Sequence, residues 1–100
     1  MKREAAVVSR YEFEAQMWAD EGSGAWHFVT LPAELSEQLR AVRSGNAARK
    51  VEARIGNSKW STALFPHDDA YVLPVKADVR RREVISVGDR VQASIEFLSR

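Results

Sequence analysis

The sequence predicts a mainly β domain in which six short strands close into a small barrel, with one amphipathic helix and a short helical turn. Three observations support this prediction. Apolar and polar residues alternate in several segments, which is the period of a strand with one buried face. Clusters of Gly, Asn, Asp and Pro separate these segments at short, even intervals. Because short strands expose their edges unless the sheet closes on itself, we expect a barrel.

Two of these segments predict a first hairpin. Residues 11–17 alternate strictly, and a turn cluster at residues 20–24 leads into an aromatic and β-branched segment at residues 25–31. The inward face of the first strand is Tyr11, Phe13, Ala15 and Met17.

The second strand of this hairpin has two possible inward faces. One face carries Trp26, Phe28 and Thr30, and the other carries His27, Val29 and Leu31. Two aromatic rings bury more area than Val and Leu, so we predict that Trp26 and Phe28 pack in the core. His27 then points outward. A lone His without a neighbouring polar group is more often a surface side chain than a ligand or a base.

An amphipathic helix is predicted after Pro32, which suits a first helical turn because its missing N–H is not needed there. Leu35, Leu39 and Val42 recur at helical spacing, and Ser44-Gly45 ends the helix. A single apolar stripe of this kind is expected to pack against the sheet.

A second hairpin is predicted from residues 50–55 and 59–65, joined by Gly56-Asn57-Ser58, because Gly and Asn tolerate positive φ. The inward residues of this hairpin are Val51, Ala53, Ile55, Trp60, Thr62 and Leu64. In the loop that follows the hairpin, His67 and Asp69 are too few to form a metal site.

The C-terminal part adds a short strand at Tyr71–Pro74, a helical turn near residues 77–82, and a tight turn at Gly88-Asp89. Residues 90–98 alternate most regularly and form the sixth predicted strand. We expect a single core made of Phe13, Phe28, Leu35, Leu39, Val51, Ile55, Leu64, Val91, Ile95 and Phe97.

Length and composition predict one domain spanning residues 1–100, with residues 1–8 as a loose N-terminal arm. The absence of Cys suits a reducing interior, so we expect a cytoplasmic protein. No segment approaches the length of a membrane span, and no residue pattern indicates a cofactor or a metal.

The net charge of +1 argues against a protein whose main task is to coat nucleic acid. The charges are nevertheless unevenly distributed: residues 11–37 hold six acidic residues and no Lys or Arg, whereas residues 40–60 hold six basic residues and only Glu52. We expect the acidic strand or its hairpin to lie beside the basic region within one molecule. The alternative is that the two meet between molecules, so we predict a monomer or a weak homodimer.

Four motifs carry a family resemblance. In chain order they are Trp26–Pro32, Trp60–Pro66, Tyr71–Arg80 and Gly88–Val91. With these motifs in this order, the chain resembles the bacterial domain-of-unknown-function family numbered nineteen-oh-five. The resemblance implies a double-split β-barrel, similar in architecture to swapped-hairpin DNA-binding regulators and to antidote proteins. It implies no established activity, although some members are joined to a domain associated with bacteriocin protection.

The chain departs from the family pattern at two positions. Ser61 stands where an Arg commonly follows the tryptophan, and Ala63 stands where a Ser commonly follows the threonine. If those residues form an anion site in relatives, that site is weakened here.

Three functional hypotheses remain. The first is a non-catalytic binding module that takes a small anion or a carboxylate-bearing partner segment, since two cations one helical turn apart can hold an anion beside aromatic faces. The second is a DNA-binding or antidote-like regulator, suggested by barrel analogy and the basic run at residues 80–82. An enzyme is the least favoured, because alternation directs Glu12 and Glu14 toward solvent. The residues of the expected binding site are Trp60, Thr62, Tyr71, Lys76 and Arg80.

Overall fold

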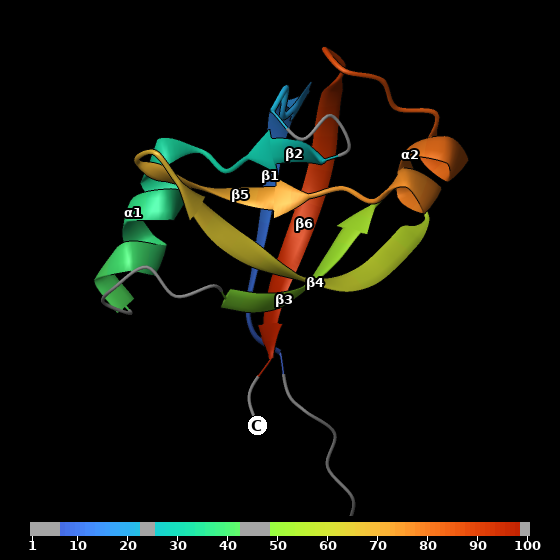
Figure 1. Cartoon of the computed structure of the whole chain (residues 1–100). Coiled ribbons are helices and arrows are strands. Elements are labelled where there is room, and N and C mark those ends of the chain that lie inside the picture. The colour runs from blue at the N-terminus through green and yellow to red at the C-terminus, as the bar shows by residue number, and fades with distance from the viewer. Residues whose placement is uncertain (1–6, 23–25, 43–48, 99–100) are drawn as a thin grey trace, which may run out of the picture.

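The protein folds as a closed antiparallel barrel with two helices (Figure 1). The computed structural model describes residues 7–22, 26–42 and 49–98. The strands follow one another around the barrel in the order β1-β2-β5-β4-β3-β6, and the fold predicted from the sequence is confirmed. The elements in chain order are β1 (Val7–Ala19), β2 (His27–Thr30), α1 (Ala33–Val42), β3 (Arg49–Ile55), β4 (Ser58–His67), β5 (Ala70–Pro74), α2 (Ala77–Glu83) and β6 (Arg90–Leu98).

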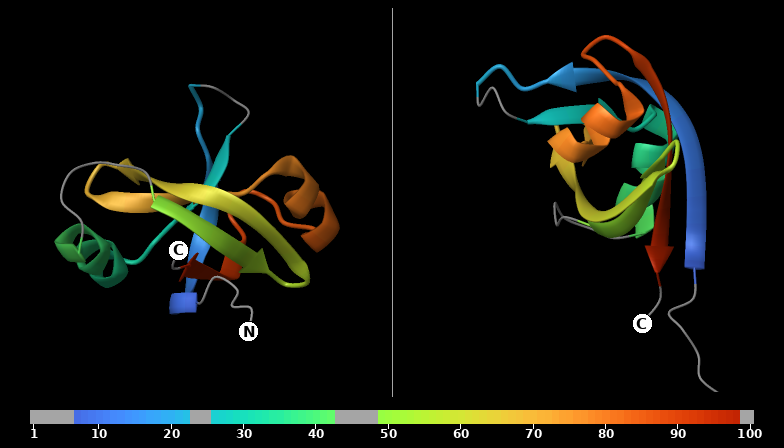
Figure 2. Two further views of the ribbon diagram at one scale, coloured as in Figure 1. Left: turned by 90° about the horizontal axis from the view of Figure 1, so that it is seen from below. Right: turned by 90° about the vertical axis from the view of Figure 1, so that its right-hand side faces the viewer.

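Two long strands, β1 and β4, each pair with one strand over part of their length and with another strand over the rest. β1 pairs with β6 through residues 7–16 and with β2 through residues 17–19. In the same way, β4 pairs with β3 through residues 58–64 and with β5 through residues 65–67. Each strand therefore leaves one partner and joins another partway along its length, and the bend that this requires in β1 is visible in Figure 2. This is the double-split arrangement.

The two tight hairpins have loops whose residues explain them. Ile55 pairs with Ser58, and His67 pairs with Ala70, so both loops contain only the two residues between. Gly56 has φ +58° at the first loop position, and Asp68 has φ +55° at the equivalent position of the second loop. Gly has no steric cost in this region and Asp is among the residues that tolerate it, so local sequence sets both reversals.

The core matches the predicted set except at one position. Leu64 and Ile95 are fully buried, and the stripe of α1 buries Leu35 and Leu39. Residues 43–48, where the helix was predicted to end at Ser44-Gly45, lie outside the described part of the chain. The predicted core residues found in the cluster are Phe13, Leu35, Leu39, Val51, Ile55, Leu64, Val91, Ile95 and Phe97.

The inward face predicted for β2 is wrong. Val29 is 0% exposed and Leu31 2% exposed, whereas Trp26 is 51% exposed. The pairing register supplies the reason: Val29 lies opposite the buried Met17, and residues opposite each other in an antiparallel pair point to the same side.

The aromatic side chains of that hairpin pack on one another instead of in the core. Phe28 lies 5.0 Å from Trp18 between ring centroids and is stacked on Trp26 at 6.0 Å. Thr30, which was also predicted to face inward, accepts a hydrogen bond from Trp18 Nε1 at 2.8 Å. Phe28 is consequently half-buried in an outer aromatic cluster and does not contribute to the core.

The helices lie at opposite ends of the barrel (Figures 1 and 2). A hydrogen bond links α1 to β5: the buried Ser36 Oγ accepts the Tyr71 N–H at 3.1 Å. Two hydrogen bonds link α2 to the start of β4: the Glu83 carboxylate accepts from Ser58 Oγ at 2.7 Å and from the Asn57 N–H at 3.3 Å.

In the described part of the basic region, neither the acidic strand nor the second strand of its hairpin adjoins β3 or β4 as predicted, because β6 lies between β1 and β3, and β5 lies between β2 and β4. Glu14 pairs with Arg90 of β6 at 3.3 Å, and Arg10 of β1 pairs with Glu96 of β6 at 3.6 Å. β6 therefore carries both the base and the acid that pair with β1, which the block pattern of charges did not reveal. No helix in the described part of the chain is long and apolar enough to cross a membrane.

Candidate functional site

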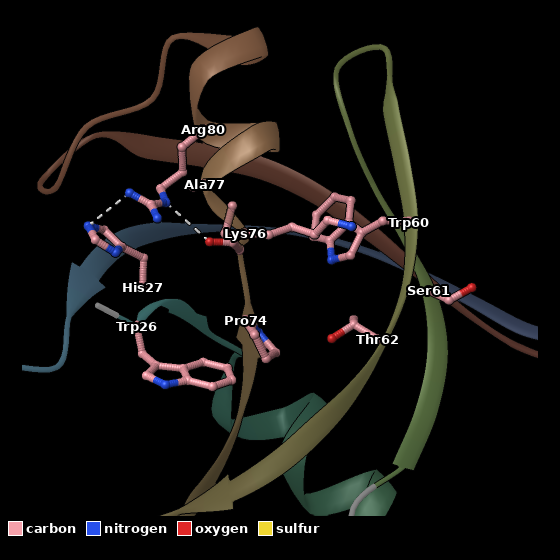
Figure 3. Close-up of a pocket in the computed structure, with 10 residues that line it drawn as sticks. Trp26, His27, Trp60, Ser61, Thr62, Pro74, Lys76, Ala77 and Arg80 are labelled. Carbon is pink, nitrogen blue, oxygen red and sulfur yellow. Dashed lines mark hydrogen bonds between the residues drawn. The ribbon is translucent and has the colours of Figure 1, made fainter. Parts of the chain in front are cut away.

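A hollow of about 370 Å³ opens in the wall of the barrel between β4 and the link from β5 to α2 (Figure 3). The first half of β4 forms one wall, and the opposite wall is the β5–α2 link with the first turns of α2. The start of β2 completes it. The lining residues are Trp26, His27, Trp60, Ser61, Thr62, Pro74, Val75, Lys76, Ala77 and Arg80.

Proline 74 explains why the wall opens at this point. The Leu31 N–H donates to Tyr71 O and the Val75 N–H donates to His27 O, so the backbone N–H and C=O groups of the odd-numbered residues of β5 point toward β2. The backbone groups of the even-numbered residues point toward β4, in agreement with the pairing of Val72 with Phe65. Pro74 comes next on that side and has no N–H to donate. The β4–β5 ladder therefore stops after Val72, and the chain turns away into α2.

Arg80 is held in a fixed position at the rim of the hollow. Its Nε donates to Val75 O at 3.2 Å, and its Nη1 lies 3.3 Å from His27 Nε2. A guanidinium has no acceptor, so we assign His27 Nε2 as the acceptor, which places the ring proton of the neutral tautomer on Nδ1. The prediction that His27 points outward is wrong: it shares the inward parity of Val29 and lines the hollow, where it contacts Arg80.

Lys76 is the second cation of the hollow. It precedes α2 and is exposed, and Figure 3 shows its side chain reaching across the opening toward Trp60. Within the described ranges, neither Lys76 nor Arg80 forms an ion pair, and the hollow has no acidic lining residue. The other two arginines of the basic run differ, because Arg81 and Arg82 lie 3.6 and 3.5 Å from Asp78 carboxylate oxygens.

The hollow brings together four of the five residues expected from the sequence. Trp60 and Thr62 point into it from β4, and Lys76 and Arg80 face them from the other wall (Figure 3). Tyr71 is not part of it, because its side chain is 2% exposed and packs in the core. Sequence reasoning missed Trp26 and His27, since the wrong parity of β2 directed them elsewhere.

The two departures from the family pattern fall on the other face of β4. Ser61 directs its side chain away from the hollow (Figure 3), and Ala63 shares its parity on the strand. Neither side chain therefore contributes to the inner surface formed by Trp60 and Thr62. No cluster of three or more potential metal ligands occurs among the residues that the structure describes.

A family model described as a domain of unknown function (DUF1905) matches residues 13–95. The chain belongs to this family. The match extends from β1 to β6 and includes every residue of the hollow, so the split in the wall of this DUF1905 domain lies inside the region that defines the family. No curated protein matches the sequence significantly.

Proposed function

We propose that this DUF1905 domain is a non-catalytic binding module that holds a small anion in the hollow between Lys76 and Arg80. The observation that supports this most directly is the pair of cations without an acidic partner in the described chain, both facing an aromatic cavity. Such a cavity favours an anion because charge-assisted hydrogen bonds are stronger than neutral ones and the apolar walls reduce competition from water.

The proposed ligand is a carboxylate, a phosphate or a sulfate. Two N–H groups of Arg80 contact Val75 and His27, and these contacts hold the guanidinium so that its remaining N–H groups can bind an oxyanion. Lys76 supplies further donors on a flexible stem. Trp60, which is 7% exposed, and Trp26 provide apolar surfaces on either side.

Two observations weigh against the alternatives. A DNA-binding or antidote-like regulator would use the basic run, but Arg81 and Arg82 are paired with Asp78 and the net charge is only +1. An enzyme acting through Glu12 and Glu14 would need shielded carboxylates, but both residues are exposed. A cytoplasmic location is also part of the proposal and rests on the absence of Cys from the sequence.

The test is ligand-induced stabilisation. Acetate, phosphate, sulfate and a panel of metabolite carboxylates are added to the protein, and the melting temperature is followed. A ligand at a concentration of about 100 Kd adds about 2.7 kcal/mol, which raises the melting temperature of a domain this size by roughly 10 to 20 °C. We expect a concentration-dependent rise with at least one anion.

The variant for this test is Lys76→Gln with Arg80→Gln, which removes both charges and keeps polar side chains of similar reach. It should abolish the shift, which is measured from the variant's own unliganded melting temperature, because loss of the Arg80 hydrogen bond to Val75 O lowers that temperature as well. The matched control is Arg81→Gln with Arg82→Gln, which removes two positive charges from α2, close in sequence to the tested pair, and should keep the full shift. A panel without any shift in the parent protein, or an equal loss in the control, would overturn the proposal. Salt-dependent retardation of random DNA that depends on Arg81 and Arg82 would favour the regulator.

A further inference from the structure

The first half of β4 has a free edge beside the hollow. β4 pairs with β3 through Leu64, but its pairing with β5 includes only residues 65–67. Along residues 58–64, no strand in the described part of the chain pairs with the second edge. An edge of this kind presents backbone N–H and C=O groups that can pair with another extended chain.

The register identifies the groups that face the gap. The tight turn makes Ile55 and Ser58 a hydrogen-bonded pair, so even-numbered residues of β4 direct their backbone groups to β3. The odd-numbered residues direct theirs to the other side. This agrees with the second hairpin, where Phe65 and His67 pair with β5. The groups that face the gap are therefore those of Lys59, Ser61 and Ala63.

The free edge is short and closed at both ends. At one end β5 occupies the position next to Phe65, and at the other end Glu83 of α2 is bonded to Ser58. From Lys59 to Ala63 the strand rises about 13 Å, which matches a peptide of four or five residues. A chain lying in this slot cannot continue past α2 as a strand, so the slot suits the end of a chain.

Charge selects which end of a chain fits. Lys76 and Arg80 stand on the wall opposite β4, and no acidic side chain lines the hollow. A free α-carboxylate provides the complementary charge, whereas an α-ammonium group would be repelled. Because α2 and its cations lie toward the Ser58 end of β4, the carboxylate must point toward that end, and the added chain must run antiparallel to β4.

We propose that the ligand of this site is the C-terminal tail of a partner protein, added to β4 as an extra antiparallel strand with its carboxylate between Lys76 and Arg80. The proposal rests on the proposed anion-binding function and names its ligand. Main-chain hydrogen bonds to Ser61 and Ala63 supply sequence-independent affinity. Tail residues opposite Thr62 point into the hollow over Pro74 and Val75 and should be apolar, while those opposite Ser61 and Ala63 point to solvent.

The test uses a synthetic library of acetylated tetrapeptides, randomised at every position, with a free C-terminus, and the same library as C-terminal carboxamides. N-acetylvaline serves as the probe for the anion site alone. We expect free-carboxylate tetrapeptides to bind at least tenfold more tightly than N-acetylvaline and at least tenfold more tightly than their carboxamides. N-methylation of the central amides of the best tetrapeptide should remove that gain.

Amide exchange locates the added strand. In a ¹H–¹⁵N spectrum, the best tetrapeptide should protect the Ser61 and Ala63 amides from exchange, whereas N-acetylvaline should not. The Thr62 amide is the internal control, because its N–H already faces β3. Ser61→Pro removes an N–H on the free edge without removing one from the β3 ladder, so it should abolish tetrapeptide binding and keep N-acetylvaline binding.

The outcomes separate the two proposals. If N-acetylvaline or another small anion binds but tetrapeptides bind no better, or the N-methylated peptide binds equally well, the added strand is refuted and the anion site stands. If neither small anions nor peptides bind, both proposals fail. Tight binding of carboxamides would contradict the role of the terminal carboxylate, and peptide binding without protection of Ser61 and Ala63 would place the tail elsewhere. The N-methylated peptide decides the question even if Ser61→Pro does not fold.

Discussion

Replacing Ser36 by Ala should destabilise the protein although it removes only one oxygen atom. Ser36 is 0% exposed and its Oγ accepts the Tyr71 N–H at 3.1 Å, across the contact of α1 with β5. Tyr71 is itself 2% exposed, so water cannot easily replace the lost acceptor. The substitution therefore leaves a buried backbone N–H without a partner.

The magnitude follows from two opposing effects. A buried donor without a partner costs about 1 to 3 kcal/mol. Ala is the better helix former and returns about 0.5 kcal/mol in the interior of α1. The expected loss in the free energy of unfolding is about 1.5 kcal/mol, which lowers the melting temperature by roughly 6 to 12 °C in a domain of this size.

Urea unfolding followed by tryptophan fluorescence measures this loss, with the denaturant slope checked for constancy. Ser61→Ala is the matched control, since Ser61 is exposed and its side chain points away from the hollow; it should stay within about 0.5 kcal/mol of the parent. In Ser36→Ala the Tyr71 amide should also exchange faster than its β5 neighbours. A loss below about 0.5 kcal/mol with unchanged exchange at Tyr71 would show that this hydrogen bond does not stabilise the junction.

Two further substitutions test the core and a strained position. Leu39→Ala should lower the free energy of unfolding by about 2 to 5 kcal/mol, because Leu39 is 3% exposed in the stripe of α1; a loss under about 1 kcal/mol in the same urea experiment would mean that this stripe is poorly packed. Val84→Gly should instead raise the free energy of unfolding by about 0.5 to 1 kcal/mol. Val84 has φ 55° at the end of α2 and is 83% exposed, so Gly relieves backbone strain and loses little contact. A lower urea midpoint would contradict this prediction.

The parts of the fold that were predictable are those set by short-range patterns. Strict alternation in β6 gave the correct inward face, and the helical spacing of Leu35 and Leu39 gave the correct face of α1. The positive φ of Gly56 was anticipated from turn chemistry. In each case the neighbouring residues along the chain contain the information, so no knowledge of distant partners is needed.

The face of β2 was not predictable in the same way. Trp26 and Phe28 bury more area than Val29 when each residue is considered alone, but the pairing of Val29 with Met17 determines the face. Pairing depends on a partner ten or more positions away, and the aromatic side chains pack against Trp18 on the outer surface. The error propagated to the site, because His27 was assigned to the wrong side of the sheet.

The site itself was partly predictable for the same reason. Lys76 and Arg80 were expected on one side of a helix because they are four residues apart. Both line the hollow, but Lys76 precedes α2 and has extended backbone, so helical spacing is not the reason. Tyr71 was expected to supply an aromatic face beside the two cations, but its side chain is buried in the core. The free edge of β4 begins where its pairing with β5 ends. Predicting that point requires both the register of the β4–β5 hairpin and the missing N–H of Pro74, and no single sequence motif contains both.

The pairing of β1 with β6 determines the order in which the domain can be assembled. Val7 lies opposite Leu98, so the strand made first during synthesis joins the strand made last. β3 also depends on β6, and without β6 both β1 and β3 lose a neighbour. Contacts between such distant parts of a chain slow folding, since a long loop must close before they form. On the ribosome this barrel can close only after β6 has left the exit tunnel, and until then β1 lacks the partner that pairs with most of its length.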